Sequence, residues 1–352
     1  MQLFKNKYWQ LFMSPFSVLY KWVMQLRNHL YDIEHKAVFR FEAKVISVGN
    51  LSMGGTGKTP FVEYILRFLI EKGYSKNKVA TLSRGYGRKS KGFRIANEKD
   101  SPITIGDEPF QIFQKFKDNI VVSVGEDRVL AIPSIIYEYP ENEIIVLDDA
   151  YQHRSVKPNL SVLLTDFNSL FYKDYVMPSG TLRESRKGAK RADVIVVTKC
   201  PINLSGSEMV KISENIKQYS DKKVFFTSVK YENIVATQES RKAVKKIILV
   251  TGIAQAQKFK DYLIEEGFDI LKHFDFADHH NFNLKEIEEI ERVANEQQAD
   301  IITTEKDWVR LISMPELTQS FQNRLFYIPI MVQFLEDEKS FHQILEESII
   351  RA

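Results

Sequence analysis

Cysteine is nearly absent from this chain of 352 residues, in which Cys200 is the only one. A single thiol excludes an internal disulfide framework and is typical of a protein from the reducing cytoplasm. The chain also lacks an excess of either charge, and its formal net charge of +3 is too small to indicate a nucleic-acid-binding protein. No run of about 20 apolar residues is present, and no cleavage site of small residues follows the apolar N-terminal part, so we expect neither a membrane span nor a signal peptide.

Apolar, β-rich segments alternate with helical patterns, as in proteins with a parallel sheet. The expected strands span residues 44–48, 78–82, 120–124, 143–147, 160–164 and 193–198. The expected helices between them include residues 60–72, 108–116 and 126–138. A second alternating set begins near residue 245. The sequence therefore predicts an α/β fold, with a parallel sheet covered by helices on both faces and a smaller C-terminal α/β domain.

The N-terminal segment differs from the rest of the chain, because residues 1–31 contain basic and aromatic side chains but no acidic one. Ser14-Pro15 is typical of a helix start, and apolar residues recur at helical spacing after it. Two interpretations stay open: an amphipathic helix on an anionic membrane surface, or a core helix packed on the sheet. We expect residues 1–35 to form this segment, residues 36–235 the main domain and residues 236–352 the second domain.

A glycine-rich loop lies between the first expected strand and the first expected helix. The consecutive backbone N–H groups of such a loop and the helix dipole favour an anion. Lys58 can reach the β- and γ-phosphates of a nucleotide, and the Thr59 hydroxyl can ligate Mg²⁺. Ser52 replaces the first glycine of the usual G-x-x-x-x-G-K-[ST] pattern. The part that faces the phosphates is kept, as Gly54, Gly55, Thr56, Gly57, Lys58 and Thr59. We therefore predict a P-loop NTPase-like fold that binds a nucleoside triphosphate.

Two further strand ends carry residues that suit this chemistry. Asp148 and Asp149 follow an apolar strand, where phosphate-loop enzymes place the acid that holds Mg²⁺. Lys199 closes a later strand, where guanine-specific relatives place a lysine beside the base. Pro201 occupies the position of their guanine-reading aspartate, so we expect adenine, and hence ATP.

Four other segments have more than one interpretation. Asp107 and Glu108 lie in a turn before an expected helix, where Asp107 could cap the helix or act as a general base toward an acceptor hydroxyl. The histidines between residues 273 and 280 match no zinc spacing, and one of them could orient a carboxylate base or lie on the surface. The basic clusters at residues 83–89 and 178–187 suit phosphate binding, or a solvated surface.

Taken together, these strings resemble the tetraacyldisaccharide 4′-kinase family, the lipid A pathway kinases of Gram-negative envelopes. The resemblance runs from about residue 40 to about residue 310, in SVGNLSMGGTGKTP, LSRGYGR, IGDEP, VGEDR, VLDDAYQHR, SGTLRE, ADHHNF and TTEKDW. Ser52 agrees with the family's own loop, whereas Ala150 stands where glycine is commoner.

The resemblance implies transfer of the ATP γ-phosphoryl group to the 4′-hydroxyl of tetraacyldisaccharide 1-phosphate, a lipid A precursor. It implies that Asp107 and Lys58 are catalytic, with His279 as the histidine partner of Asp107 and His280 as the alternative. It further implies Mg²⁺ ligation by Thr59, Asp148 and Asp149. Its implied substrate-binding residues are Glu108, Arg128, Gln152, His153 and Arg183. Because the acceptor is a lipid, we expect the N-terminal segment to dock peripherally on the cytoplasmic face of the inner membrane.

Rival functions predict other residues. A partitioning ATPase carries a second lysine where this chain has Met53, and a metallochaperone usually carries a cysteine pair, whereas this chain has Cys200 alone. A membrane-attached nucleotide-binding module without catalysis would need no acceptor base, and Asp107 would then be dispensable.

Overall fold

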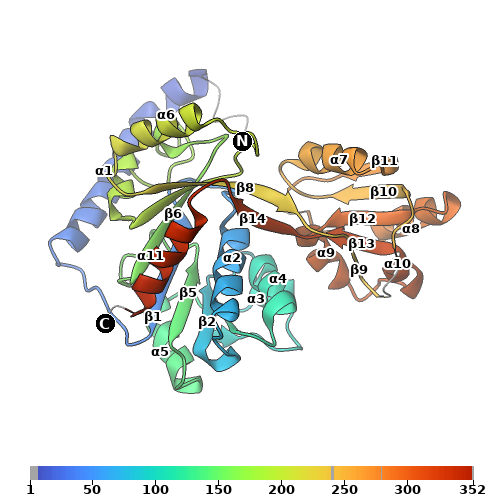
Figure 1. Cartoon of the computed structure of the whole chain (residues 1–352), viewed down its shortest axis with the longest axis horizontal. Helices are drawn as coiled ribbons and strands as arrows, with labels where there is room; N and C mark the ends of the chain where they lie inside the picture. Colours follow the sequence, from blue (N-terminus) through green and yellow to red (C-terminus); the bar gives the residue numbers. More distant parts are fainter. Residues whose placement is uncertain (1–6, 239–241, 279, 351–352) are drawn as a thin grey trace.

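A computed structural model describes residues 7–238, 242–278 and 280–350, and these form two sheets flanked by helices (Figure 1). The large sheet has nine strands in the order β14-β8-β7-β6-β1-β5-β2-β4-β3, and the small sheet has five in the order β11-β10-β12-β13-β9. All pairings of the large sheet are parallel except β3 with β4 and β14 with β8, which lie at its two edges. The predicted α/β class with a parallel sheet is confirmed.

The large domain is built as follows. Its strands are β1 (Lys44–Asn50), β2 (Val79–Ser83), β3 (Arg94–Ile95), β4 (Val121–Val124), β5 (Ile144–Asp148), β6 (Leu160–Asp166), β7 (Val194–Thr198), β8 (Val224–Tyr231) and β14 (Ile330–Phe334). Its helices are α1 (Lys7–Asp32), α2 (Lys58–Glu71), α3 (Pro102–Ile105), α4 (Asp107–Phe116), α5 (Arg128–Glu138), α6 (Gly206–Lys217) and α11 (Glu338–Ile350), with short 3₁₀ turns η2 (Lys76–Lys78), η3 (Phe171–Lys173) and η4 (Arg186–Arg191).

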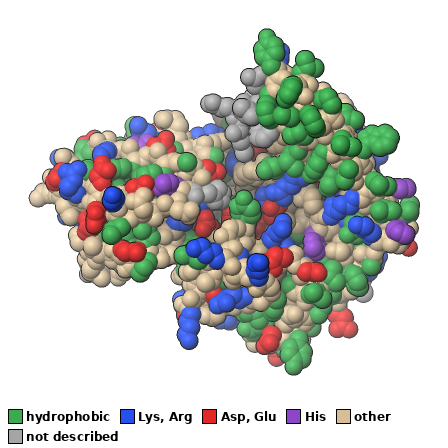
Figure 2. Space-filling view, turned by 180° about the vertical axis from the view of Figure 1, so that it is seen from behind, with side chains coloured by type: hydrophobic (Ala, Val, Ile, Leu, Met, Phe, Trp, Pro, Cys, Tyr) green, Lys and Arg blue, Asp and Glu red, His purple; other side chains and the backbone are tan. Residues whose placement is uncertain are grey.

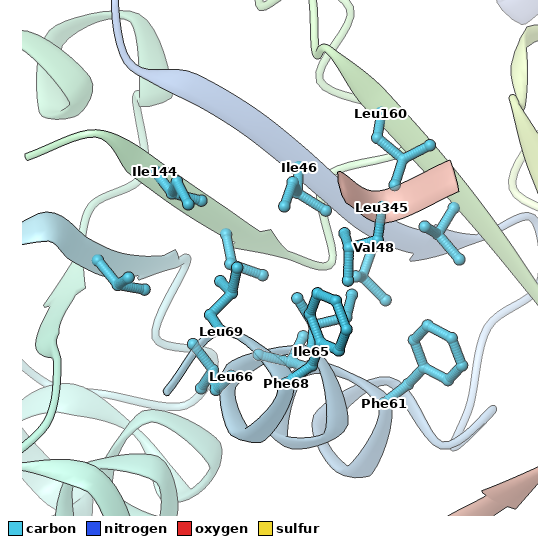
Figure 3. Packing of buried hydrophobic residues seen from close by; sticks show 14 of the residues in the cluster. Ile46, Val48, Phe61, Ile65, Leu66, Phe68, Leu69, Ile144, Leu160 and Leu345 are labelled. Atoms are coloured by element: carbon cyan, nitrogen blue, oxygen red, sulfur yellow. The ribbon is translucent and has the colours of Figure 1, made fainter. Parts of the chain in front are cut away.

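Helices cover both faces of this sheet, which is why its strands are apolar on both sides. One face packs against α2, α4 and α11, where Phe61, Ile65 and Leu69 of α2 meet Ile46 and Val48 of β1 (Figure 3). The opposite face packs against α5 and α6 in two further clusters. Burial of α2 against the central strands fixes the start of that helix at the end of β1.

The second domain holds the small sheet. Its strands are β9 (Val235–Ala236), β10 (Lys246–Thr251), β11 (Asp269–Asp275), β12 (Asp300–Thr304) and β13 (Leu325–Ile328), and its helices are α7 (Ala256–Glu265), α8 (Leu284–Glu296), α9 (Glu305–Ile312) and α10 (Gln319–Arg324). The strands β11, β10, β12 and β13 are parallel, and β9 joins β13 in the antiparallel sense.

The C-terminal end of the chain departs from the expected division at residue 235. Strand β14 pairs with β8 of the large sheet, with Ile330 opposite Tyr231 and Phe334 opposite Thr227. Phe341 and Leu345 of α11 are buried in the core of the large domain. The second domain is therefore inserted between β8 and β14, two strands that lie side by side and extend toward it in Figure 1.

Helix α1 lies along the outside of the large domain with an apolar face that no described residue covers. None of its residues is buried, so the core-helix interpretation is wrong. Nine large apolar side chains on it are 57% to 85% exposed: Tyr8, Leu11, Phe12, Phe16, Val18, Leu19, Trp22, Val23 and Leu26. Figure 2 shows hydrophobic side chains gathered in the corresponding region, next to a hollow in which Lys and Arg side chains collect. Among the described residues, no helix combines the length and the apolar character that a bilayer span requires.

The expected helix start at Ser14-Pro15 is also wrong, because the helix is already formed at Lys7 and Pro15 lies inside it. A proline removes one backbone N–H from the helical ladder. Here the Ser14 hydroxyl donates to the Leu11 carbonyl at 2.8 Å, which satisfies the acceptor that the proline leaves unpaired.

Candidate active site

The carboxyl ends of the central parallel strands meet at one edge of the large sheet. Val48 of β1 lies opposite Asp148 of β5, and Asp166 of β6 lies opposite Thr198 of β7. Ligands of open α/β sheets bind at this edge. The glycine loop runs from the end of β1 to the start of α2 at the same place.

Side chains from neighbouring strands hold this loop in shape. The Thr56 hydroxyl accepts a 2.9 Å hydrogen bond from the Asn50 amide, and the Thr56 carbonyl accepts one of 2.9 Å from the Thr198 hydroxyl. The Lys199 ammonium donates to the Gly55 carbonyl and to Asp166 Oδ2, the latter at 2.9 Å. Lys199 therefore lies beside the loop, at the strand end where the sequence predicts a nucleotide-binding lysine.

The start of α2 is prepared for an anion. Its N-cap is Gly57, with φ of 78°, a left-handed conformation that glycine adopts without steric cost. No described side chain caps the helix there, so its first N–H groups can bind phosphate oxygens. Lys58 and Thr59 open the same turn.

Charged side chains converge next to Lys58. Its ammonium lies 3.7 Å from Asp149 Oδ1, and the Arg183 guanidinium pairs with both Asp149 oxygens at 3.0 and 3.2 Å. Arg183 also donates to Gln152 Oε1 at 3.3 Å. Asp149 has φ of 50°, which turns the chain sharply after β5. The structure thus brings together Lys58, Asp149, Arg183 and Gln152.

Asp148 is buried at the end of β5, with 5% of its surface exposed. Burial raises the pKa of its carboxyl to about 7, the carboxylates of Asp149 and Glu108 add to this shift, and the cations of Lys58 and Arg128 oppose it. Among the described residues, its Oδ1 has no hydrogen-bond partner. A buried, unpartnered carboxylate oxygen beside the phosphate loop fits a hard divalent cation such as Mg²⁺.

Arg128 lies deeper than a surface substrate ligand would, whereas His153 is half-buried. Arg128 is 2% exposed, and its guanidinium donates to the backbone carbonyls of Gly125, Glu126 and Asp148. Burial lowers its pKa to about 10. Burial also lowers the pKa of His153, and the nearby Arg128 guanidinium adds to this shift. These contacts indicate that Arg128 holds the end of β5 in place.

Asp107 is the first residue of α4 rather than its cap, because the N-cap is Gly106. The Asp107 carboxylate instead meets Arg310 of the second domain, whose Nε and Nη2 each lie 2.7 Å from Oδ2. His279 lies outside the described residues. His280 stacks on Phe276 at 4.4 Å between ring centroids, and its Nε2 lies 2.9 Å from Glu286 Oε2.

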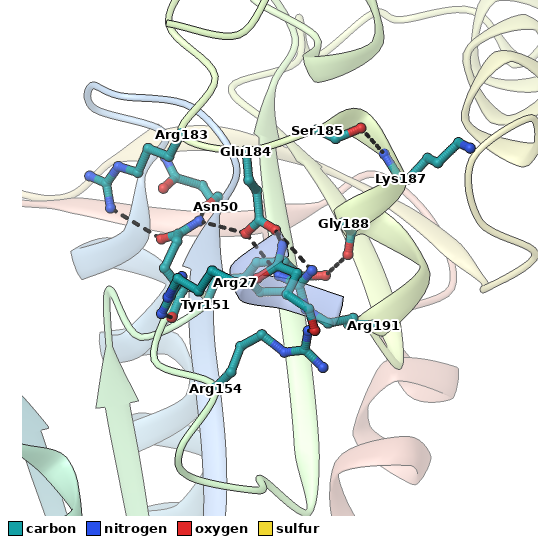
Figure 4. Close-up of polar contacts among 12 residues, drawn as sticks. Arg27, Asn50, Tyr151, Arg154, Arg183, Glu184, Ser185, Lys187, Gly188 and Arg191 are labelled. Atoms are coloured by element: carbon teal, nitrogen blue, oxygen red, sulfur yellow. Dashed lines mark hydrogen bonds and ion pairs between the residues drawn. The ribbon is translucent and has the colours of Figure 1, made fainter. Parts of the chain in front are cut away.

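The sequence-based reasoning missed two residues at this site. Glu184 is buried, pairs with Arg191 at 2.8 Å and accepts hydrogen bonds from Gln152 and from Asn28 of α1 (Figure 4). It belongs to the SGTLRE string, so the resemblance could have suggested it. Arg310 lies outside every string used above, and only the packing of the two domains reveals its contact with Asp107.

A family model, curated relatives and a solved structure that match this chain all belong to one kinase family. A family model described as tetraacyldisaccharide-1-P 4′-kinase matches residues 9–350. A tetraacyldisaccharide 4′-kinase of Flavobacterium johnsoniae is 40% identical over 332 residues, and one of Flavobacterium psychrophilum is 42% identical over 334; each match covers 93% of this chain and 93% of the relative. Among solved structures, LpxK from Aquifex aeolicus in complex with ATP is similar, with a TM-score of 0.75 and 27% identity, over 97% of this chain and 99% of that chain.

Proposed function

The chain belongs to the tetraacyldisaccharide-1-phosphate 4′-kinase family, and we propose that the residues around its glycine loop transfer the ATP γ-phosphoryl group to the 4′-hydroxyl of a tetraacyldisaccharide 1-phosphate. The chain is an ATP-dependent kinase of lipid A biosynthesis, in preference to a partitioning ATPase, a metallochaperone or a non-catalytic module. One observation carries the assignment of residues: the uncapped start of α2, Lys58 and the acid pair Asp148 and Asp149 converge at one sheet edge.

Binding of the triphosphate comes first. The N–H groups at the start of α2 and the Lys58 ammonium would hold the β- and γ-phosphates, and Lys199 would lie against the base. Thr59, Asp148 and Asp149 would hold Mg²⁺, with Asp149 oriented by Arg183. When bound, Mg²⁺ neutralises charge on the β- and γ-phosphate oxygens.

Transfer then requires an aligned acceptor. Asp107 would accept the proton of the 4′-hydroxyl while the 4′-oxygen forms a bond to the γ-phosphorus. At the same time the bond between the γ-phosphorus and the β,γ-bridging oxygen would break, and ADP would leave. His279 would orient Asp107, as the family resemblance implies. We assign Glu108, Gln152, His153 and Arg183 to the acceptor side of the site, and Arg128 to the support of β5.

Helix α1 supplies the third part of the proposal, peripheral docking on an anionic membrane at the cytoplasmic face. Its apolar face is exposed, whereas polar atoms on its other side bond to the domain. Tyr20 donates to the Arg183 carbonyl at 3.0 Å, and Arg27 donates to the Gln152 carbonyl at 2.6 Å. A lipid surface that covered the apolar face would therefore bring the active-site edge close to a lipid acceptor.

Exchange of two exposed apolar residues of α1 for acids tests this docking. We expect Leu19→Glu with Trp22→Glu to lower vesicle binding by at least about 10-fold, because each buried apolar side chain contributes about 1.5–3 kcal/mol. Co-sedimentation with vesicles of anionic phospholipid measures the effect. The matched control is Leu130→Glu with Tyr137→Glu on α5, residues that are equally exposed but lie outside α1. Equal vesicle binding by both double variants would exclude docking through α1.

A further inference from the structure

Helix α9 of the second domain packs against α4 of the large domain, and charged side chains meet at both ends of this contact. Arg310, near the end of α9, reaches Asp107 at the start of α4. Glu305, at the start of α9, reaches Lys115 near the end of α4. The two helices therefore run in opposite directions, and one of the two charged contacts falls on the residue proposed as the acceptor base.

The Arg310 side chain is fixed from within the second domain. It is 8% exposed, and its Nη1 donates to Asp307 Oδ1 at 3.0 Å and to the Gly252 carbonyl at 3.4 Å. Asp307 is itself fully buried, and its other oxygen accepts hydrogen bonds of 2.9 Å from the Gly252 N–H and 2.7 Å from the Thr304 hydroxyl. These bonds leave Nε and Nη2 of Arg310 directed at Asp107 Oδ2.

The far end of the helix pair joins α9 to the phosphate-loop helix. The Lys115 ammonium lies 2.8 Å from Glu305 and 2.6 Å from Glu63 of α2, and the Gln111 amide donates to the same two carboxylates at 3.1 and 2.8 Å. Both glutamates are buried. Because α2 begins at Lys58, this cluster holds α4, α9 and the nucleotide-binding helix in one arrangement.

From this geometry we propose that Arg310 is a positioning residue. It fixes the carboxylate of Asp107 in the orientation in which that carboxylate can take the proton of the substrate's 4′-hydroxyl. The proposal rests on the function proposed above for Asp107. A carboxylate offers about four lone-pair sites, so contacts of Arg310 with Oδ2 leave capacity to accept a proton. Two nitrogens of the Arg310 guanidinium, which belongs to the second domain, contact the same oxygen of Asp107, so alignment of the base depends on the packing of α9 against α4.

Steady-state kinetics of variants test this role, with labelled ATP and the disaccharide acceptor. We expect Arg310→Ala to lower kcat by about 10- to 100-fold, with the KM for ATP within about two-fold, because a misplaced base slows transfer without weakening nucleotide binding. Arg310→Lys should recover part of this loss, since lysine keeps the charge but lacks the planar fork. The matched control is Arg292→Ala on α8 of the same domain, which removes only an exposed ion pair with Glu296, and its kcat should stay within about two-fold of the parent.

A double-mutant cycle separates positioning from a structural effect. In the Asp107→Asn background, Arg310→Ala should lower kcat by less than about two-fold, because the base that it orients is already lost. An equal loss of kcat in both backgrounds, or an equal loss in Arg310→Ala and Arg292→Ala, would overturn the proposal. Wild-type kcat in both Arg310 variants would also overturn it. Normal turnover of Asp107→Asn alone would instead refute the proposed base. If Arg310→Ala does not give a cooperative thermal transition, the same cycle is run with Arg310→Lys.

Discussion

Replacement of Lys58 by alanine is expected to lower phosphoryl transfer by about 10³-fold or more. Removal of a single preorganised donor to a developing charge typically costs about 10²–10³ in kcat, and Lys58 also contributes to binding of the ground state. Lys58 is the first residue of the uncapped helix α2, and its ammonium lies 3.7 Å from Asp149. The initial rate of label transfer from γ-labelled ATP to the acceptor measures the effect.

The matched control for Lys58→Ala is Lys72→Ala, which removes a lysine just beyond the opposite end of the same helix. Lys72 pairs at the surface with Glu346, so its loss should leave turnover within about two-fold and stability nearly unchanged. If Lys58→Ala turns over like the Lys72 variant, the glycine loop does not bind the transferred phosphate.

Asp107→Asn is expected to produce the second large effect, a fall in turnover of about 10²–10⁴-fold with ATP binding retained. The amide keeps the shape of the side chain but cannot take the proton of the acceptor hydroxyl, and general-base catalysis contributes about this factor. The proposed base lies on α4 and the proposed phosphate site at the start of α2, so nucleotide affinity should be preserved. Turnover and the dissociation constant of ATP, measured on the same preparation, give the two numbers.

Asp127→Asn is the control for this variant. Asp127 is a true helix cap, whose side chain accepts from the Val129 N–H at 2.9 Å, and asparagine caps helices equally well. Its turnover should match the parent. Should Asp107→Asn also match the parent, the carboxylate of Asp107 serves only its ion pair with Arg310, and the acceptor base lies elsewhere.

Local patterns were sufficient to predict the centre of the large domain. The strand β1, the glycine loop and the helix α2 each carry a signal within a few residues, and the apolar strands read as buried on both faces. The positions of Lys58 and of the acid pair at Asp148 follow, because parallel strands bring their carboxyl ends to one edge.

Contacts between distant segments were not predictable in this way. Strand β14 pairs with β8 after about 100 intervening residues, and nothing in its five residues specifies which sheet it joins. The ion pair of Arg310 with Asp107 spans 203 positions, so it depends on the packing of two domains. The same holds for the buried place of Glu184, which takes partners from α1, from Gln152 and from Arg191.

The measurement that tests the central claim most directly is incubation of the purified chain with γ-labelled ATP, Mg²⁺ and tetraacyldisaccharide 1-phosphate. The proposed function predicts label on the lipid, at the 4′-position, and one ADP for each labelled lipid. Release of labelled inorganic phosphate, with no label on the lipid, would contradict it.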